Sequence, residues 1–116
     1  MKFYGYKKCG TSRKAEKALE EMGVEYEFID STLNPPKLSD IKKIIQNSGQ
    51  PAKKAYNTSG LQYKSENWKD KLKGMSEAEM ISALEGQGKL LKRPMILEGD
   101  KATIGFKEDD FKATWG

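Results

Sequence analysis

The residue best suited to covalent chemistry is Cys9, the only cysteine in a chain of 116 residues. Lys7, Lys8 and Arg13 lie close to it in sequence. Nearby positive charge lowers the pKa of a cysteine thiol and so favours the nucleophilic thiolate at neutral pH. The alternative is that Cys9 is a small buried hydrophobic residue, as many single cysteines are. The charges and the position leave both interpretations open.

Two arginines stand out in a chain that otherwise uses lysine for its positive charge. Of 21 basic residues, only Arg13 and Arg93 are arginine. A guanidinium presents a planar fork of donors that binds an oxyanion through two hydrogen bonds. Arg13 follows the cysteine directly, and Arg93 precedes Pro94. Both arginines are therefore candidates for oxyanion binding, with an ordinary surface salt bridge as the alternative for each.

Cys9 is expected at the junction between a strand and a helix. Residues 2–6 are rich in aromatic side chains and predict a short strand. Apolar residues then recur at helical spacing until Gly23: Ala15, Ala18, Leu19 and Met22. The first turn of such a helix presents unpaired backbone N–H groups and the positive end of the helix dipole. This position also favours a thiolate.

A second strand and a second helix follow. Residues 25–29 alternate polar and apolar side chains, which predicts a strand that completes a parallel βαβ unit. Asn34-Pro35-Pro36 interrupts the chain, and a proline can open the helix that comes next. The apolar face of that helix ends near residues 47–49 and has four members: Leu38, Ile41, Ile44 and Ile45.

The rest of the chain predicts short helices, a hairpin and a last helix. Residues 57–60 read as a turn, and a helix over 75–84 begins with a capping box of Ser76 and Glu79. Strands over 94–97 and 102–104 flank a turn at 98–101. A final helix over 107–115 is expected to pack through three aromatic residues: Phe106, Phe111 and Trp115.

The composition limits the class of protein. The chain is 33% charged and 36% hydrophobic, and it contains no apolar stretch of about 18 residues as a membrane span requires. With no signal peptide visible before the first strand, we expect one soluble, cytoplasmic domain over residues 1–116. A single cysteine forms no intramolecular disulfide and fits a reducing compartment.

Two kinds of site are not expected. The chain has no histidine, which excludes a Cys–His dyad and a zinc site within it. We expect neither a metal nor a bound cofactor. The net charge is +4, but the lysines are interspersed with acids, and no basic stripe alternates with stacking aromatic residues. Direct nucleic-acid binding is therefore not indicated.

Four motifs in order carry a family resemblance: Cys9-Gly10-Thr11-Ser12-Arg13, Asn34-Pro35-Pro36, Arg93-Pro94 and residues 104–108. With them, essentially the whole chain resembles the arsenate reductase ArsC/Spx family of the thioredoxin-like superfamily. The resemblance implies an α/β thioredoxin-like fold with a mixed sheet, βαβ then ββα, and a helical insertion at about residues 37–88. It also implies that Pro94 lies beside the cysteine loop, usually after a cis peptide bond.

The resemblance further implies an enzyme of the glutaredoxin-dependent arsenate reductase type. In such enzymes a cysteine thiolate attacks arsenate, and glutathione or another small thiol attacks the arseno-cysteine. Glutaredoxin, or a thioredoxin-type protein, completes the reduction to arsenite. Cys9 would be the nucleophile. The oxyanion would be held by Arg93, the Thr11 and Ser12 hydroxyls and the backbone N–H groups of Gly10 to Arg13, with Arg13 adding charge. Helix capping is the alternative role for Thr11 and Ser12.

The chain departs from the reductase pattern at two places. Two further arginines of arsenate reductases align near Asn57 and Phe106, and neither residue supplies a cationic fork. Lys53, Lys54 or Lys107 could compensate as point charges.

Two other functions therefore remain open. One is an Spx-like regulator that binds the α subunit of RNA polymerase; Ser12 at the second position of the Cys-X-X-Cys motif leaves it no intramolecular redox switch. The other is an oxidoreductase that resolves mixed disulfides.

Overall fold

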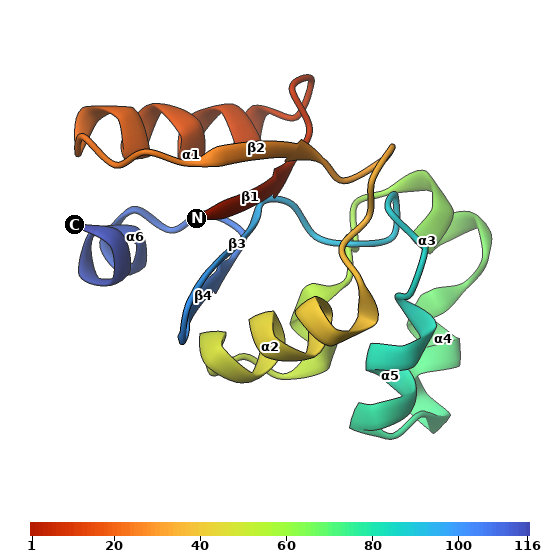
Figure 1. The fold of residues 1–116 in the computed structure, drawn as a ribbon. Helices are drawn as coiled ribbons and strands as arrows, with labels where there is room; N and C mark the ends of the chain where they lie inside the picture. The colour runs from red at the N-terminus through yellow and green to blue at the C-terminus, as the bar shows by residue number, and fades with distance from the viewer.

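The computed structural model describes residues 1–116 and contains a four-stranded mixed sheet with helices on both faces (Figure 1). The strands are β1 (Lys2–Gly5), β2 (Glu27–Asp30), β3 (Met95–Glu98) and β4 (Lys101–Ile104). They are ordered β2-β1-β3-β4. β1 pairs parallel with β2 and antiparallel with β3, and β4 pairs antiparallel with β3. This arrangement confirms the predicted α/β class with a βαβ unit followed by ββα.

Six α-helices and two short 3-10 helices connect and follow the strands. They are α1 (Gly10–Glu21), α2 (Leu38–Ser48), α3 (Leu61–Ser65), α4 (Trp68–Lys71), α5 (Glu77–Ala83) and α6 (Glu108–Trp115), with η1 (Ala52–Ala55) and η2 (Leu72–Gly74) between them. α1 and α6 cover one face of the sheet and α2 covers the other, while α3, α4 and α5 gather beyond α2 (Figure 1). None of these helices combines the length and apolar character needed to cross a bilayer.

The alternation of side chains along the strands divides the core into two layers. Phe3 and Ile96 are partners across β1 and β3, and both are fully buried on the side of α1 and α6. Their neighbours Tyr4 and Met95 are also partners, and they belong to the layer under α2. Because successive strand residues point to opposite faces, one register fixes both layers. Leu19 in the first layer packs α1 against the sheet, and only residues 6–9 separate the end of β1 from the start of α1.

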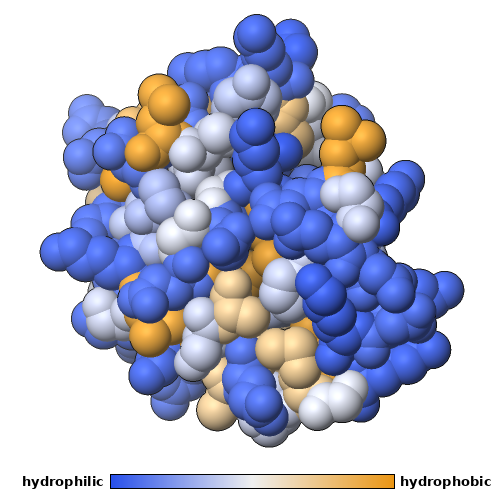
Figure 2. All heavy atoms as spheres, turned by 90° about the vertical axis from the view of Figure 1, so that its right-hand side faces the viewer, coloured by the Kyte–Doolittle hydropathy of each residue, from blue (hydrophilic) through white to orange (hydrophobic).

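The surface around the helical middle of the chain is mainly polar. The face that lies on the right in Figure 1 is predominantly hydrophilic, and its apolar side chains are scattered (Figure 2). The large hydrophobic residues with high exposure are Leu33 and Leu61. This surface agrees with the high proportion of charged residues in the sequence.

The structure differs from the sequence expectation at several element boundaries. β2 begins at Glu27 rather than at residue 25, because Glu27 pairs with Lys2, the first residue of β1. The hairpin turn is only Gly99-Asp100, since Glu98 already pairs with Lys101. Gly99 has a positive φ of 59°, which glycine adopts without strain. Proline does not open α2, whose N-cap is Lys37. The capping box at α5 is formed by Ser76 and Glu79 as predicted.

An isolated bridge brings the turn after η1 to the segment before β3. Tyr56 and Leu91 are antiparallel partners. The Asn57 N–H donates to the Leu90 carbonyl at 2.8 Å, and the Lys92 N–H donates to the Ala55 carbonyl at 2.7 Å. Residues 55–57 are thereby fixed beside residues 90–92, just before the Arg93–Pro94 peptide bond, which is cis.

Gly88 permits a close contact with the backbone of Ser31. A Cβ atom at this position would lie 2.1 Å from the Ser31 carbonyl oxygen. We therefore expect Gly88→Ala to lower the free energy of unfolding by about 1–3 kcal/mol, because the backbone must shift. Gly74→Ala is the matched control, since no neighbouring heavy atom lies within 4 Å of its Cβ position. Chemical denaturation measures both variants, and equal stability of the two would contradict the close contact.

Candidate active site

Cys9 lies at the N-cap position of α1, directly after the loop that leaves β1. Its backbone is extended, with φ of −86° and ψ of 122°. The Cys9 N–H donates to the Tyr6 carbonyl at 2.9 Å, and its own carbonyl accepts from the Arg13 N–H at 3.0 Å. The thiol is free and half-buried, and the first turn of α1 contains no acidic residue. The N–H groups of this turn are thus available to an anion at the thiol position.

The surroundings of Cys9 favour its thiolate. Burial raises the pKa of the Cys9 thiol, but hydrogen bonds from the Ser12 N–H, the Ser12 hydroxyl and the Thr11 N–H lower it, as does the charge of Arg93. Together these groups outweigh burial, so the pKa lies below the ordinary value of a cysteine thiol. A lowered pKa increases the thiolate fraction at neutral pH. A half-buried thiol with these donors does not fit the interpretation of Cys9 as an inert core residue.

Ser12 links the thiol to the loop that precedes it. Its side chain is fully buried, and its Oγ accepts a hydrogen bond from the Tyr6 N–H at 3.2 Å. The Ser12 hydroxyl also lowers the pKa of Cys9. The N-cap of α1 is Cys9 itself, and no side chain caps the helix. Helix capping is therefore the wrong role for both Ser12 and Thr11. Ser12 instead supports the thiolate and holds the loop.

Cys9 faces an open cavity of about 410 Å³. Thr11, Lys92 and Arg93 line the cavity with it. Its remaining wall is residues 56–60, which the bridge of Tyr56 to Leu91 holds in place. The Arg93 guanidinium stacks over the Tyr6 ring, with 5.0 Å between its Cζ and the ring centroid. The cavity thus combines a nucleophile with two cations, which is the chemistry of an anion site.

Several residues expected at the site lie outside this cavity. Gly10 and Arg13 are exposed and do not line it, and the Arg13 N–H is already occupied by the Cys9 carbonyl. Pro94 is buried, and its carbonyl accepts from the Gly105 N–H at 2.8 Å. Neither arginine forms a salt bridge, so that alternative is wrong for both. The structure brings together Cys9, Thr11 and Arg93 at the cavity, and the buried Ser12 lowers the pKa of the thiol.

The cation beside Arg93 is Lys92, which sequence reasoning missed. Its place directly before Arg93 was a signal that could have identified it. The lysines considered as replacements for the absent arginines do not line the Cys9 cavity: Lys53, Lys54 and Lys107. Of the two aligned positions, Asn57 lines the cavity. Phe106 instead packs against Phe111 with ring centroids 4.9 Å apart.

The side chains that could bind a metal are not clustered. No group of three or more His, Cys, Asp or Glu residues is placed to hold an ion. The polar groups at Cys9 are donors and cations, which suit an anionic substrate instead.

The Ser12 hydroxyl provides a test of the thiolate environment. Because it lowers the pKa of Cys9, Ser12→Ala should move the alkylation midpoint of the thiol to higher pH and slow alkylation at neutral pH. Thr11→Ala is the matched control, since Thr11 acts through its backbone N–H. Alkylation rates measured against pH report both midpoints. A midpoint for Ser12→Ala equal to that of the wild type would remove Ser12 from the thiolate environment.

Comparison with known proteins places the chain in a family. The ArsC family model matches residues 4–114. The Bacillus subtilis protein YusI is 46% identical over 115 residues, which cover 99% of this chain and 98% of YusI. The crystal structure of an ArsC family related protein from Bacteroides fragilis has a TM-score of 0.92 at 37% identity, and covers 97% of this chain and 94% of that one.

An arsenate reductase of Neisseria meningitidis is a more distant relative. It is 25% identical over 116 residues, covering 97% of this chain and 96% of the reductase. The family model, these relatives and the mixed sheet agree with the resemblance carried by the cysteine motif. The chain belongs to the ArsC family and has its thioredoxin-like fold.

Proposed function

We propose that the protein is a thiol-dependent oxidoreductase of the arsenate reductase type, and that residues 1–116 act as one domain. The observation that carries this proposal is the low-pKa Cys9 thiol facing a cavity that contains Arg93 and Lys92. A nucleophilic thiolate and two cations suit attack on a bound oxyanion. Membership of the ArsC family and the Neisseria relative support arsenate, or a similar oxyanion, as the substrate.

The residues have distinct roles in this proposal. Arg93 binds the oxyanion through its guanidinium fork, and Lys92 adds a point charge. The Thr11 hydroxyl, which lines the cavity, completes the oxyanion site. The N–H groups of Thr11 and Ser12 act on the Cys9 sulfur, and that of Gly10, outside the cavity, adds to the positive end of α1. Ser12 stabilises the thiolate rather than the substrate. Arg13 contributes only long-range charge, because its side chain is exposed outside the cavity.

The reaction proceeds in three steps. The Cys9 thiolate attacks arsenic, an As–S bond forms, the As–OH bond breaks, and the hydroxyl takes up a proton from solvent and leaves as water. An external thiol then attacks the Cys9 sulfur, a mixed disulfide forms, and the electron pair of the As–S bond stays on arsenic, which leaves as arsenite. A second thiol attacks the outer sulfur of the mixed disulfide and releases the Cys9 thiolate. Two thiols are thereby oxidised to one disulfide while As(V) is reduced to As(III).

Both thiols must come from outside the chain, because Cys9 is its only cysteine. Glutathione or another low-molecular-weight thiol would supply the first, and a glutaredoxin- or thioredoxin-type protein could supply the second. No bound cofactor takes part. Such thiols are kept reduced in the cytoplasm, where we place the protein.

A second candidate is an Spx-like regulator that binds the RNA polymerase α subunit. It is favoured by Asn57 and Phe106, which leave the chain without the two further arginines that the reductase pattern would place there. Pull-down of the purified α subunit tests this function directly. Attack of Cys9 on disulfides is a related activity that would use the same thiolate.

We expect arsenate reduction to require both Cys9 and an external thiol. Arsenite formation from arsenate should occur with glutathione plus glutaredoxin and vanish in Cys9→Ser, because no other residue can carry the arsenic or the mixed disulfide. Turnover by the wild-type protein with a non-thiol reductant alone would argue against the three-step reaction. Activity that survives in Cys9→Ser would exclude Cys9 from catalysis.

Arg93 should be difficult to replace by lysine. Arg93→Lys keeps the charge but loses the planar fork, and loss of a charged hydrogen-bonding partner should weaken oxyanion affinity by about ten-fold. Arg13→Lys is the control and should leave affinity unchanged, because Arg13 does not line the cavity. Arsenate and phosphate titrations monitored by NMR at Cys9 measure both variants. Equal affinity of Arg93→Lys and the wild type would show that Arg93 does not bind the oxyanion.

A further inference from the structure

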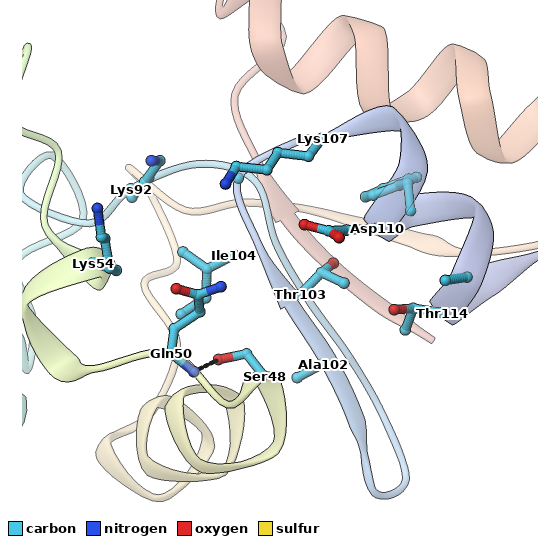
Figure 3. Close-up of a pocket in the computed structure, with 13 residues that line it drawn as sticks. Ser48, Gln50, Lys54, Lys92, Ala102, Thr103, Ile104, Lys107, Asp110 and Thr114 are labelled. Carbon is cyan, nitrogen blue, oxygen red and sulfur yellow. Dashed lines mark hydrogen bonds between the residues drawn. The ribbon is translucent and has the colours of Figure 1, made fainter.

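A second cavity, of about 330 Å³, lies along β4 between the C-terminal end of α2 and α6 (Figure 3). β4 is the last strand of the sheet, so the side of the strand away from β3 is not paired. We call this cavity the lysine groove. Its charged residues are Lys54, Lys92, Lys107 and Asp110, and its other polar side chains are Ser48, Gln50, Thr103 and Thr114.

The charge of the lysine groove is positive and not neutralised. Lys54 and Lys92 lie on one side, and Lys107 extends toward them from the start of α6 (Figure 3). None of the three takes part in a salt bridge, whereas Lys7 and Lys112 are paired with acids. Asp110 is the only acidic residue in the lining. An excess of two positive charges around one cavity attracts a ligand that carries more than one negative charge.

Backbone contacts hold the three lysine-bearing segments together. The Lys92 N–H donates to the Ala55 carbonyl at 2.7 Å, next to Lys54. The Gly105 N–H donates to the Pro94 carbonyl at 2.8 Å, two residues before Lys107. A Cβ atom at Gly105 would lie 3.0 Å from Lys92 Cε, so glycine leaves room for the lysine stem. The convergence of the lysines is therefore built into the fold.

The lysine groove adjoins the Cys9 cavity. Lys92 lines both of them, so a ligand in the groove lies beside the cavity that contains the thiol. The groove has the volume of a small-molecule site, and polar hydroxyl and amide groups accompany its lysines. A molecule that spans both cavities would have anionic groups at one end and a group that reacts with Cys9 at the other.

We propose that the lysine groove binds the carboxylates of an anionic low-molecular-weight thiol and so directs its sulfur to Cys9. This inference rests on the proposed function, which requires an external thiol, and it names the class of that thiol. A thiol with two carboxylates can use the charges of Lys54 and Lys107, whereas a neutral thiol cannot. The groove thus sets the reductant preference of the Cys9 site.

Disulfide exchange tests the groove without arsenate. The Cys9 thiolate attacks a small disulfide, forms a mixed disulfide with one half, and releases the other half as a thiolate. The measured quantity is a ratio of two exchange rates. The numerator is the rate with glutathione disulfide, which carries carboxylates, and the denominator is the rate with neutral bis(2-hydroxyethyl) disulfide. In Lys54→Gln/Lys107→Gln this ratio should fall about five-fold, as expected for two exposed ion pairs. Mass spectrometry follows both reactions.

The control variant is Lys43→Gln/Lys53→Gln, which removes the same charge from exposed positions outside the groove. Its ratio should remain that of the wild type. An unchanged ratio in Lys54→Gln/Lys107→Gln, or an equal fall in the control, would overturn the groove assignment. Titration with S-methylglutathione should shift the amide signals of Gln50, Thr103 and Thr114, and shifts confined to other residues would also overturn it.

The same measurements separate this inference from the proposed function. If the wild type reduces no arsenate but the ratio falls as expected, the arsenate reductase proposal fails and the anionic thiol site stands. If arsenate is reduced and the ratio does not change, the groove assignment alone fails.

Discussion

The antiparallel pairing of β1 with β3 is the interaction on which the site depends. Tyr4 lies opposite Met95, so the chain that leaves β1 toward Cys9 and the chain that enters β3 through Arg93 meet at the same end of the sheet. Cys9 and Arg93 come from opposite ends of the sequence, and no local sequence pattern connects them. Because both strands are also buried on both faces, the pairing cannot slip without moving Phe3 and Ile96 out of their layer.

Short-range hydrogen bonds, rather than the neighbouring lysines, stabilise the Cys9 thiolate. Lys7 donates to Glu16 at 2.8 Å and lies over the Phe28 ring, 4.1 Å from its centroid. Its ammonium group is therefore already paired with a carboxylate. The donors that act on the sulfur come from Ser12 and Thr11 within the first turn of α1. The sequence predicted a lowered pKa for Cys9 both from nearby charge and from its place at a helix N-terminus, and the larger contributions that lower the pKa come from the helix N-terminus.

Local signals predicted the elements well, and non-local contacts account for what was missed. The apolar spacing of α1 and α2 and the capping box at Ser76 depend on neighbouring residues, so the sequence is sufficient for them. The start of β2 depends on where β1 begins, and the turn at 57–60 reaches Cys9 only through the bridge of Tyr56 to Leu91. The packing of Phe106 against Phe111 is a tertiary contact of the same kind, whereas Lys92 had a sequence signal in its place directly before Arg93.

The presence of serine at position 12 also determines which molecules can reduce Cys9 after it has been oxidised. Ser12 stands at the second position of the Cys-X-X-Cys pattern, where a second thiol could form a disulfide with an oxidised Cys9. A hydroxyl at this position stabilises the thiolate, but it cannot reduce an oxidised Cys9 by forming a disulfide with it. The chain consequently cannot form an internal disulfide, and any oxidised form of Cys9 persists until an external molecule reduces it.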